Sequence, residues 1–234
     1  MTRSFTSVVL AVAVPAAIIV LVIVAGLVTT GTGSRSAGPP AAEVPPVAAT
    51  PTPEQLRQVS RSTGIPRRAL TAYVAAAQTV ERDDTTCRIA WNTLAGIGSS
   101  ESSHGAFGGA RLDAEGVARP LIIGVPLDGS GGNRAIRDTD GGRLDGDTRW
   151  DRAVGPMQFI PTTWSTWGAD GDGDGRVDPH DIDDAALAAA RYLCRAGTDL
   201  SSSAGWSRAV LTYNNSGEYA RKVARTATEY AEAT

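Results

Sequence analysis

The sequence predicts a mainly α-helical domain. Apolar residues recur every three or four positions in several segments, which is typical of helices with one face in a core. Ser, Thr, Asp and Pro stand near the starts of these segments, where helices favour them. Patterns that alternate apolar and polar residues are scarce, and residues 120–127 (PLIIGVPL) are the best candidate for a short extended piece.

Six segments of the chain have helical features. Thr52 is placed to cap the first, with Pro53 in its first turn, and Asp183 or Asp184 to cap the fourth. Between the third and fourth segments we expect a long irregular insertion, residues 105–154. The six segments are residues 52–64, 65–80, 87–101, 181–194, 206–214 and 216–233.

The composition suits one globular domain with extra segments, because 42% of the 234 residues are hydrophobic and 20% are charged. The formal net charge of −3 is small. A nucleic-acid-binding domain carries a basic patch or stripe, so this class is excluded. We expect a monomer.

Residues 8–28 form an uncharged apolar run after the weakly basic residues 1–7. A bilayer-spanning helix needs roughly 20 apolar residues, whereas a cleaved signal has an apolar core of roughly 7–15. The length favours an uncleaved transmembrane anchor with residues 1–7 in the cytoplasm, and Pro15 keeps a cleaved signal open. We therefore expect a domain outside the cytoplasm, either anchored in the membrane or secreted.

Residues 29–52 are rich in Pro, Ala, Gly, Ser and Thr and have few large apolar side chains. Such a composition cannot build a core and predicts a semi-extended linker. We expect folded structure to begin near Pro53.

Cys87 and Cys194 are the only two cysteines. Export to an oxidising compartment favours a disulfide between them. The bridge would close a loop on the order of 100 residues, which the chain-entropy model values at roughly 4–5 kcal/mol. The alternative is two separate buried thiols.

A single carboxylate ends the third helical segment. Glu101 lies four residues after Ile97 and seven after Leu94, so it continues the apolar face of that helix. A carboxylate at the wall of an apolar cleft resists ionisation, and its pKa rises as a general acid requires. Ser102 is placed to donate a hydrogen bond that aims it, and we also expect Ser102 to contact the substrate. The alternative is a solvated residue at a helix end.

The segment AVGPMQFIPTTW, residues 153–164, places a polar side chain among apolar ones. Gly155 and Pro156 predict a tight turn into a helix. Gln158 follows, and its amide offers two donors and an acceptor to sugar hydroxyl and acetamido groups. The alternative for Met157 and the nearby aromatic residues is a place in the core.

The segment LTYNNSGEYARKV contains Tyr213, Asn214 and Tyr219. Tyrosine and asparagine together suit a polar, stacking wall for a sugar ring. The alternative is a capped helix start, with Ser216 as the cap.

The segment DGDGDGRVDPHD, residues 170–181, has the spacing of a calcium-binding loop, with Gly175 at the sixth position, where the chain must turn. Carboxylates this close repel one another unless a dication neutralises them. The segment therefore predicts a structural Ca²⁺ ion, and the alternative is a flexible loop without a metal. The predicted ligands are Asp170, Asp172, Asp174, the Arg176 carbonyl, Asp178 and Asp181.

Residues 137–151 (RDTDGGRLDGDTRWD) form a second acidic stretch, in which the calcium spacing is broken. We expect an ordered lip beside a substrate groove. A second metal site and a solvated loop are the alternatives.

Three motifs in this order, ESSHG, GPMQFIPTTW and YNNSGEY, resemble those of the lytic transglycosylases of bacterial cell walls. With the acidic loop they most resemble the membrane-bound B type in its actinobacterial form. The resemblance covers about residues 56–230. It implies a goose-lysozyme-like helical fold for residues 53–234 as the catalytic domain, and cleavage of peptidoglycan glycan strands between N-acetylmuramic acid (MurNAc) and N-acetylglucosamine (GlcNAc). The chain departs from the B type in the Ser-Ser-His after the glutamate and in the 105–154 insertion.

By that resemblance Glu101 is the catalytic acid and then base, and Met157, Gln158, Tyr213 and Asn214 contact the glycan near the cut bond. One carboxylate is enough, because the sugar's own C6 hydroxyl replaces water and leaves a 1,6-anhydro ring. Hydrolytic glycosidases use a second carboxylate. A hydrolytic muramidase and a non-catalytic, calcium-dependent cell-wall-binding module remain as alternatives.

Overall fold

The computed structural model describes residues 43–234, and the predicted segments 1–7 and 8–28 and the linker up to residue 42 lie outside the described residues. Within residues 43–234, no helix is both long and apolar enough to cross a membrane. The described part is mainly α-helical, as expected, with one short antiparallel strand pair.

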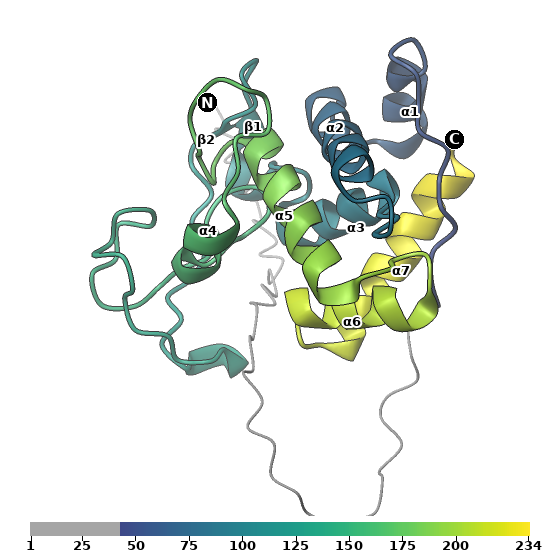
Figure 1. Cartoon of the computed structure of the whole chain (residues 1–234). Coiled ribbons are helices and arrows are strands. Elements are labelled where there is room, and N and C mark those ends of the chain that lie inside the picture. Colours follow the sequence, from purple (N-terminus) through teal and green to yellow (C-terminus); the bar gives the residue numbers. More distant parts are fainter. Residues whose placement is uncertain (1–42) are drawn as a thin grey trace, which may run out of the picture.

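Figure 1 shows the helices gathered in one body, with the chain between α3 and α4 projecting to one side. The helices are α1 (Leu56–Thr63), α2 (Arg67–Asp83), α3 (Trp91–Ser102), α4 (Pro161–Trp167), α5 (Ile182–Gly197), α6 (Ser203–Tyr213) and α7 (Gly217–Glu232). Strands β1 (Arg111–Leu112) and β2 (Ala118–Arg119) pair antiparallel, and 3-10 turns lie at Phe107–Gly109 and Ser130–Gly132.

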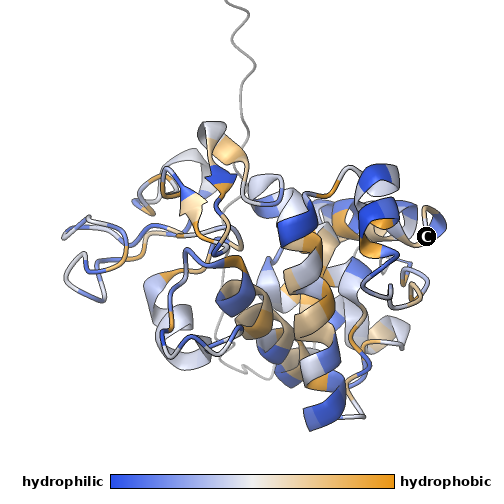
Figure 2. Cartoon of the chain, turned by 90° about the horizontal axis from the view of Figure 1, so that it is seen from above, coloured by the Kyte–Doolittle hydropathy of each residue, from blue (hydrophilic) through white to orange (hydrophobic). Residues whose placement is uncertain are grey.

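The core forms where α5 packs against α2 and α6, and where α3 packs against α7. Helix α5 is buried on most of its surface because small alanines from Ala185 to Ala190 let its neighbours approach closely. Large side chains, among them Trp91 and Trp206, fill the remaining space. Figure 2 shows the corresponding orange, apolar faces turned inward between the helices.

The single disulfide joins Cys87, just before α3, to Cys194 near the end of α5, with their Cα atoms 5.3 Å apart. The predicted pairing is confirmed. The bridge ties the start of α3 to the central helix of the core, across 107 residues of sequence.

Residues 43–52 pack on the domain, so the expectation that a linker continues to residue 52 is wrong for them. Asn92 donates to the Pro46 carbonyl and accepts from the Ala48 amide, and the Trp91 indole donates to the Ala49 carbonyl. Ala48 is buried. A segment poor in large apolar groups is held here by hydrogen bonds from the first turn of α3.

Two helix starts differ from the predicted ones. Asp181, rather than Asp183 or Asp184, caps α5, because its side chain accepts the Asp183 amide. The turn at Gly155 and Pro156 does not lead directly into a helix. Instead, Val154 pairs with Phe159 across the turn, and helix α4 begins only at Pro161.

The insertion, residues 105–154, is irregular, as expected, and its central part is extended. The backbone of residues 122–127 pairs with residues 151–155: Gly124 donates to the Ala153 carbonyl and Gly155 to that of Ile122. The predicted extended piece at 120–127 thus lies beside the turn that carries Gln158.

Candidate active site and acidic loop

Glu101 lies in the last turn of α3, half-buried, with its carboxylate hydrogen-bonded to the Tyr219 hydroxyl of α7 at 2.5 Å. Desolvation raises the pKa of Glu101 to about 8, against opposing effects from the Tyr219 hydrogen bond and the Lys222 charge. The environment therefore keeps this acid protonated at neutral pH while leaving it in contact with solvent. This agrees with the expected position on the apolar face of the helix.

The chain leaves α3 through a left-handed turn. Ser103 and His104 have φ values of 52° and 61°, and Gly105 follows at 82°. Ser102 is buried; its hydroxyl donates to the Pro156 carbonyl at 2.6 Å and accepts the Gly105 amide at 2.7 Å. Ser102 was predicted to aim Glu101 and contact substrate, but the structure uses its hydroxyl to fasten this turn to the Pro156 backbone.

The GPMQF turn lies against α6. Met157 is fully buried, and the buried Tyr213 hydroxyl donates to its carbonyl at 2.8 Å. Both residues were predicted to contact substrate; the structure places them in the core, where they hold the turn. Gln158 has a φ of 51°, and its amide donates to the Gly155 carbonyl at 2.9 Å. A Cβ at Gly124 would come within 3.2 Å of the Gln158 side-chain oxygen, so glycine leaves room for it.

Tyr219 and Asn214 are both buried, but within the described residues only Tyr219 has a hydrogen-bond partner for its side-chain donor. Tyr219, predicted to contact the sugar, is buried and gives its hydroxyl to Glu101. Asn214 is 2% exposed, and its Nδ2 has no hydrogen-bond partner in the described part of the chain. A buried amide without a partner is costly and calls for an explanation. Ser216 caps α7 as expected, accepting the Tyr219 amide.

The acidic loop between α4 and α5 brings together a set of carboxylates that differs from the predicted one. Oxygens of Asp170, Asp172 and Asp184 lie within 4.8 Å of one another, and those of Asp172, Asp181 and Asp183 form a second such group. Of the other predicted ligands, Asp174 accepts the Arg176 amide, and Asp178 accepts the His180 amide. Asp183 and Asp184, expected only as helix caps, thus join the cluster.

The donor set of this cluster fits a hard divalent cation. Burial, together with the charges of Asp172 and Asp170, raises the pKa of Asp184 to about 6. Burial and the neighbouring charges of Asp183 and Asp184 also raise the pKa of Asp181. Carboxylate oxygens in such groups are ligands that Ca²⁺ prefers. Arg68 of α2 forms an ion pair with Asp183 and supplies part of the neutralising charge.

The acidic loop presses directly on the turn that carries Gln158. A Cβ at Gly155 would lie 1.7 Å from the Pro179 carbonyl oxygen, so only glycine fits at this contact. The next carbonyl, that of His180, accepts the Ala118 amide of β2. The end of the acidic loop therefore contacts both the turn at Gly155 and strand β2.

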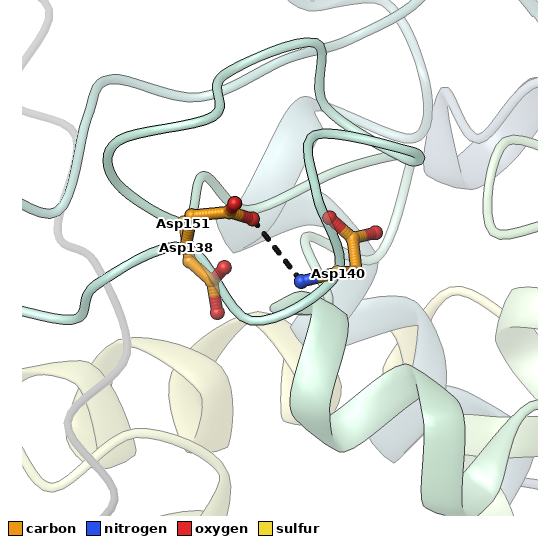
Figure 3. A group of neighbouring side chains, drawn as sticks. All are labelled: Asp138, Asp140 and Asp151. Carbon is orange, nitrogen blue, oxygen red and sulfur yellow. Dashed lines mark hydrogen bonds between the residues drawn. The ribbon is translucent and has the colours of Figure 1, made fainter.

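The second acidic stretch forms a closed loop, which Figure 3 shows with the carboxylates of Asp138, Asp140 and Asp151 near one another. Asp138 accepts three backbone amides, from residues 140–142, and Asp151 accepts the amide and hydroxyl of Thr139. That this loop forms a lip beside a substrate groove stays a prediction. Its carboxylates are already satisfied by its own backbone and by Thr139.

Three residues near the site were not singled out from the sequence. Lys222, one turn after Tyr219, acts on the Glu101 carboxylate; the i, i+3 spacing on α7 is the signal that points to it. Arg68 reaches the acidic cluster from a distant helix, which the sequence does not reveal. His104 lies in the turn after α3 but is buried.

The family model described as Transglycosylase SLT domain matches residues 136–211. The match spans the second acidic stretch, the GPMQF turn, the acidic loop and most of α6, about a third of the chain; Glu101 and Tyr219 lie outside it. No curated protein and no solved structure matches the chain. The match and the helical architecture, consistent with a lysozyme-like fold, support a relationship to the lytic transglycosylases, with peptidoglycan as the substrate.

Proposed function

We propose that the chain is a peptidoglycan lytic transglycosylase that cleaves the MurNAc–GlcNAc β-1,4 bond and leaves a 1,6-anhydro-MurNAc end. The observation that carries the proposal is the Glu101 carboxyl, half-buried, hydrogen-bonded by Tyr219, and with its pKa raised to about 8. A carboxyl with this pKa is protonated at neutral pH and able to donate to a glycosidic oxygen as a general acid.

The reaction is written with Glu101 acting twice. The Glu101 carboxyl protonates the glycosidic oxygen, and the bond from that oxygen to C1 of MurNAc breaks. The 2-acetamido oxygen of MurNAc stabilises the positive C1. The ionised Glu101 then takes the proton of the MurNAc C6 hydroxyl, whose oxygen closes on C1. Glu101 ends protonated, so the cycle needs no water. The Tyr219 hydroxyl stabilises the carboxylate between the two steps.

Within residues 43–234, no carboxylate acts on the pKa of Glu101, which favours attack by the sugar's own hydroxyl over hydrolysis. The groups that act on the pKa of Glu101 are Tyr219 and Lys222, and neither is a carboxylate. Among the acids of the described insertion, Asp113 pairs with Arg119, and Asp151 is bound by Thr139. A hydrolase would need one such group to activate water.

Gln158 and Asn214 are the predicted glycan contacts that keep polar groups for a ligand. The Gln158 amide nitrogen is bound to Gly155, which leaves its oxygen as an acceptor for a sugar hydroxyl or acetamido N–H. The unpartnered Nδ2 of Asn214 suits an acetamido carbonyl. We infer that these two side chains, rather than Met157 or Tyr213, hold the sugar.

The test is product analysis of murein digested by the full-length chain. Mass spectrometry is expected to show muropeptides with 1,6-anhydro ends, which are lighter by one water than reducing-end products. Reducing ends would identify a muramidase instead. Binding to murein without any release, and equal binding by Glu101→Gln, would identify a non-catalytic wall-binding module.

We propose that Ca²⁺ binds the acidic loop as a structural ion, held by Asp170, Asp172 and Asp184. When bound, the ion would neutralise the clustered carboxylates and brace the loop against the GPMQF turn. In this group Asp184 takes the place that the sequence spacing assigned to Asp181, which caps α5 and lies in the neighbouring group with Asp172 and Asp183.

Thermal unfolding in chelator and in excess Ca²⁺ tests this proposal. Calcium at about 100 times its Kd is expected to raise the Tm by about 5–10 °C. Asp184→Asn should abolish the calcium-induced shift. Asp178→Asn is the matched control and should keep it, since Asp178 lies outside the carboxylate groups. The opposite pattern would restore the ligand set predicted from the spacing.

We propose that the domain works outside the cytoplasm. The disulfide supports this location, because such bonds persist in oxidising compartments. We also propose that the chain is anchored in the membrane, as in the membrane-bound B type; the apolar run at residues 8–28 is the sole support for this part of the proposal. Fractionation of cells expressing the full chain tests it: the protein should stay in the membrane fraction if the run is an uncleaved anchor.

A further inference from the structure

The backbone beyond Glu101 takes an unfavourable conformation that something must hold. Ser103 and His104 are consecutive non-glycine residues in the left-handed region, which is costly for residues with a Cβ. The His104 amide also donates to the Gly98 carbonyl at 3.0 Å, which closes the end of α3. Backbone strain of this kind persists only where the surroundings over-determine it.

The His104 imidazole lies between two tyrosine hydroxyls. It is 7% exposed, with Nδ1 3.2 Å from the Tyr73 hydroxyl and Nε2 2.9 Å from the Tyr230 hydroxyl. Tyr73 belongs to α2 and Tyr230 to the last turns of α7. The ring thus ties the exit of α3 to the helices on its two sides.

Both tyrosines also contact α3 itself, within the turn before Glu101. The Tyr73 hydroxyl packs so closely on Gly98 that a Cβ there would lie 2.0 Å from it. Tyr230 interacts with the Ser99 side chain. The hydroxyls, the imidazole and the α3 backbone therefore form one connected cluster around the end of the helix that carries Glu101.

The geometry suits a neutral imidazole. A neutral ring has one nitrogen that donates and one that accepts, and a tyrosine hydroxyl can take either role. Burial lowers the pKa of His104 to about 4, so the ring stays neutral between pH 5 and 8. A phenyl ring of similar size would fill the space but leave the hydroxyls of the buried Tyr73 and the half-buried Tyr230 without this partner.

We propose that His104 is a positioning residue, whose imidazole, held by Tyr73 and Tyr230, fixes the left-handed exit of α3 and thereby the direction of the Glu101 carboxyl. The proposal rests on the proposed function of Glu101. It differs from a packing role because it requires both ring nitrogens.

Imidazole NMR of the full-length chain tests the neutral state directly. The chain has only two histidines, and the signals absent in His104→Phe identify His104. We expect a single neutral tautomer from pH 5 to 8, with titration only near pH 4. Titration with an ordinary pKa, or averaging of the two tautomers, would overturn the proposal.

Kinetics separate positioning from packing. His104→Phe is expected to lower kcat by about 100-fold with KM little changed, since small misplacement of a reacting group has effects of this size. His104→Gln keeps a donor and an acceptor and should restore most of the rate. Tyr230→Phe removes one hydroxyl and should cost about tenfold. Lower Tm with unchanged kcat in all three would leave only a packing role and refute the inference.

A carboxyl titration of Glu101 gives a readout that does not depend on turnover. The charged or titratable groups facing Glu101 are Tyr219 and Lys222 of α7 and Tyr213 of α6. His104→Phe should lower the pKa of Glu101 by letting water reach it, whereas His104→Gln should not. If wild-type chain releases no anhydro products but this shift occurs, the proposed function fails and the positioning role stands. An unchanged Glu101 pKa in His104→Phe, with product release intact, would overturn the positioning role alone.

Discussion

Glu101 and Asp151 are two carboxylates enclosed by protein, with different surroundings. Asp151 is fully buried, and both its oxygens accept hydrogen bonds from Thr139. Glu101 keeps contact with solvent and accepts one, from Tyr219. Burial raises the pKa of both acids, but only for Glu101 does it reach about 8. Burial alone therefore does not make a general acid; incomplete hydrogen bonding and access for a substrate are needed as well.

The largest expected effect is on turnover when the catalytic proton is removed. Glu101→Gln should reduce the release of anhydro-muropeptides by about 10²–10⁴-fold, the range of a general acid–base contribution. The isosteric amide still accepts from Tyr219, so the fold should be kept. Asp151→Asn is the matched control and should leave the rate within a few-fold of wild type. Comparable losses in both variants would contradict the distinction drawn between the two acids.

The next largest expected effect is a change in the free energy of unfolding with pH. The folded pKa of Glu101, about 8, lies above the ordinary glutamate pKa of 4.5, so the folded state binds one more proton between these values. Stability should therefore fall as pH rises from about 4.5 to 8. The expected fall is about 2–4 kcal/mol, since one pKa unit corresponds to about 1.4 kcal/mol and partial exposure screens part of it.

Denaturant titrations of wild type and Glu101→Gln at matched pH values measure this contribution. Between about pH 4.5 and 8, the unfolding free energy of wild type should fall relative to that of Glu101→Gln. A flat difference would show that Glu101 is not desolvated, and that it resembles a solvated residue at a helix end.

Removal of the Tyr219 hydroxyl should have a smaller effect on the rate. Tyr219→Phe takes away the hydrogen bond that stabilises the ionised Glu101, and a bond to a charged group is worth about 1.5–3 kcal/mol. We expect kcat to fall by about 10–100-fold and the alkaline limb of the pH profile to move upward. Tyr192→Phe, whose hydroxyl donates to the Thr212 carbonyl, is the control and should behave as wild type.

The smallest expected effect is on stability when Asp151, the second of the two acids compared above, is replaced. Asp151→Ala should destabilise the protein by about 1–3 kcal/mol, because the Thr139 amide and hydroxyl lose the hydrogen bonds that the buried Asp151 carboxylate accepts. Asp151→Asn keeps one acceptor oxygen and should cost less. Thermal unfolding of the two variants measures the difference, and a larger loss in Asp151→Asn would show that the negative charge itself holds the loop.

Much of the fold could be predicted because local signals agree with the tertiary structure. The apolar spacing of α2, α3 and α5 and the Ser216 cap are properties of neighbouring residues, and two cysteines leave one intramolecular pairing. The start of α5 was misassigned because three nearby aspartates all suit a cap, and only the backbone conformation selects Asp181.

The candidate site was predicted in composition but not in the roles of its members. The sequence singled out Glu101, the GPMQF turn and the Tyr213–Tyr219 segment, and these segments do meet. It assigned Ser102, Met157, Tyr213 and Tyr219 to the substrate, whereas their polar groups bind protein. Which atom of a polar residue faces a ligand depends on packing between distant helices, which local spacing does not encode.

The sequence by itself determined the helical class, the disulfide, the lone acid at the end of an apolar helix face and the acidic loop, because each depends on residue types and short spacings. The tertiary structure decided the raised pKa of Glu101, the carboxylate group that includes Asp184, and the burial of His104 between Tyr73 and Tyr230. These depend on desolvation and on contacts between residues up to 126 positions apart, which exist only once the helices have packed.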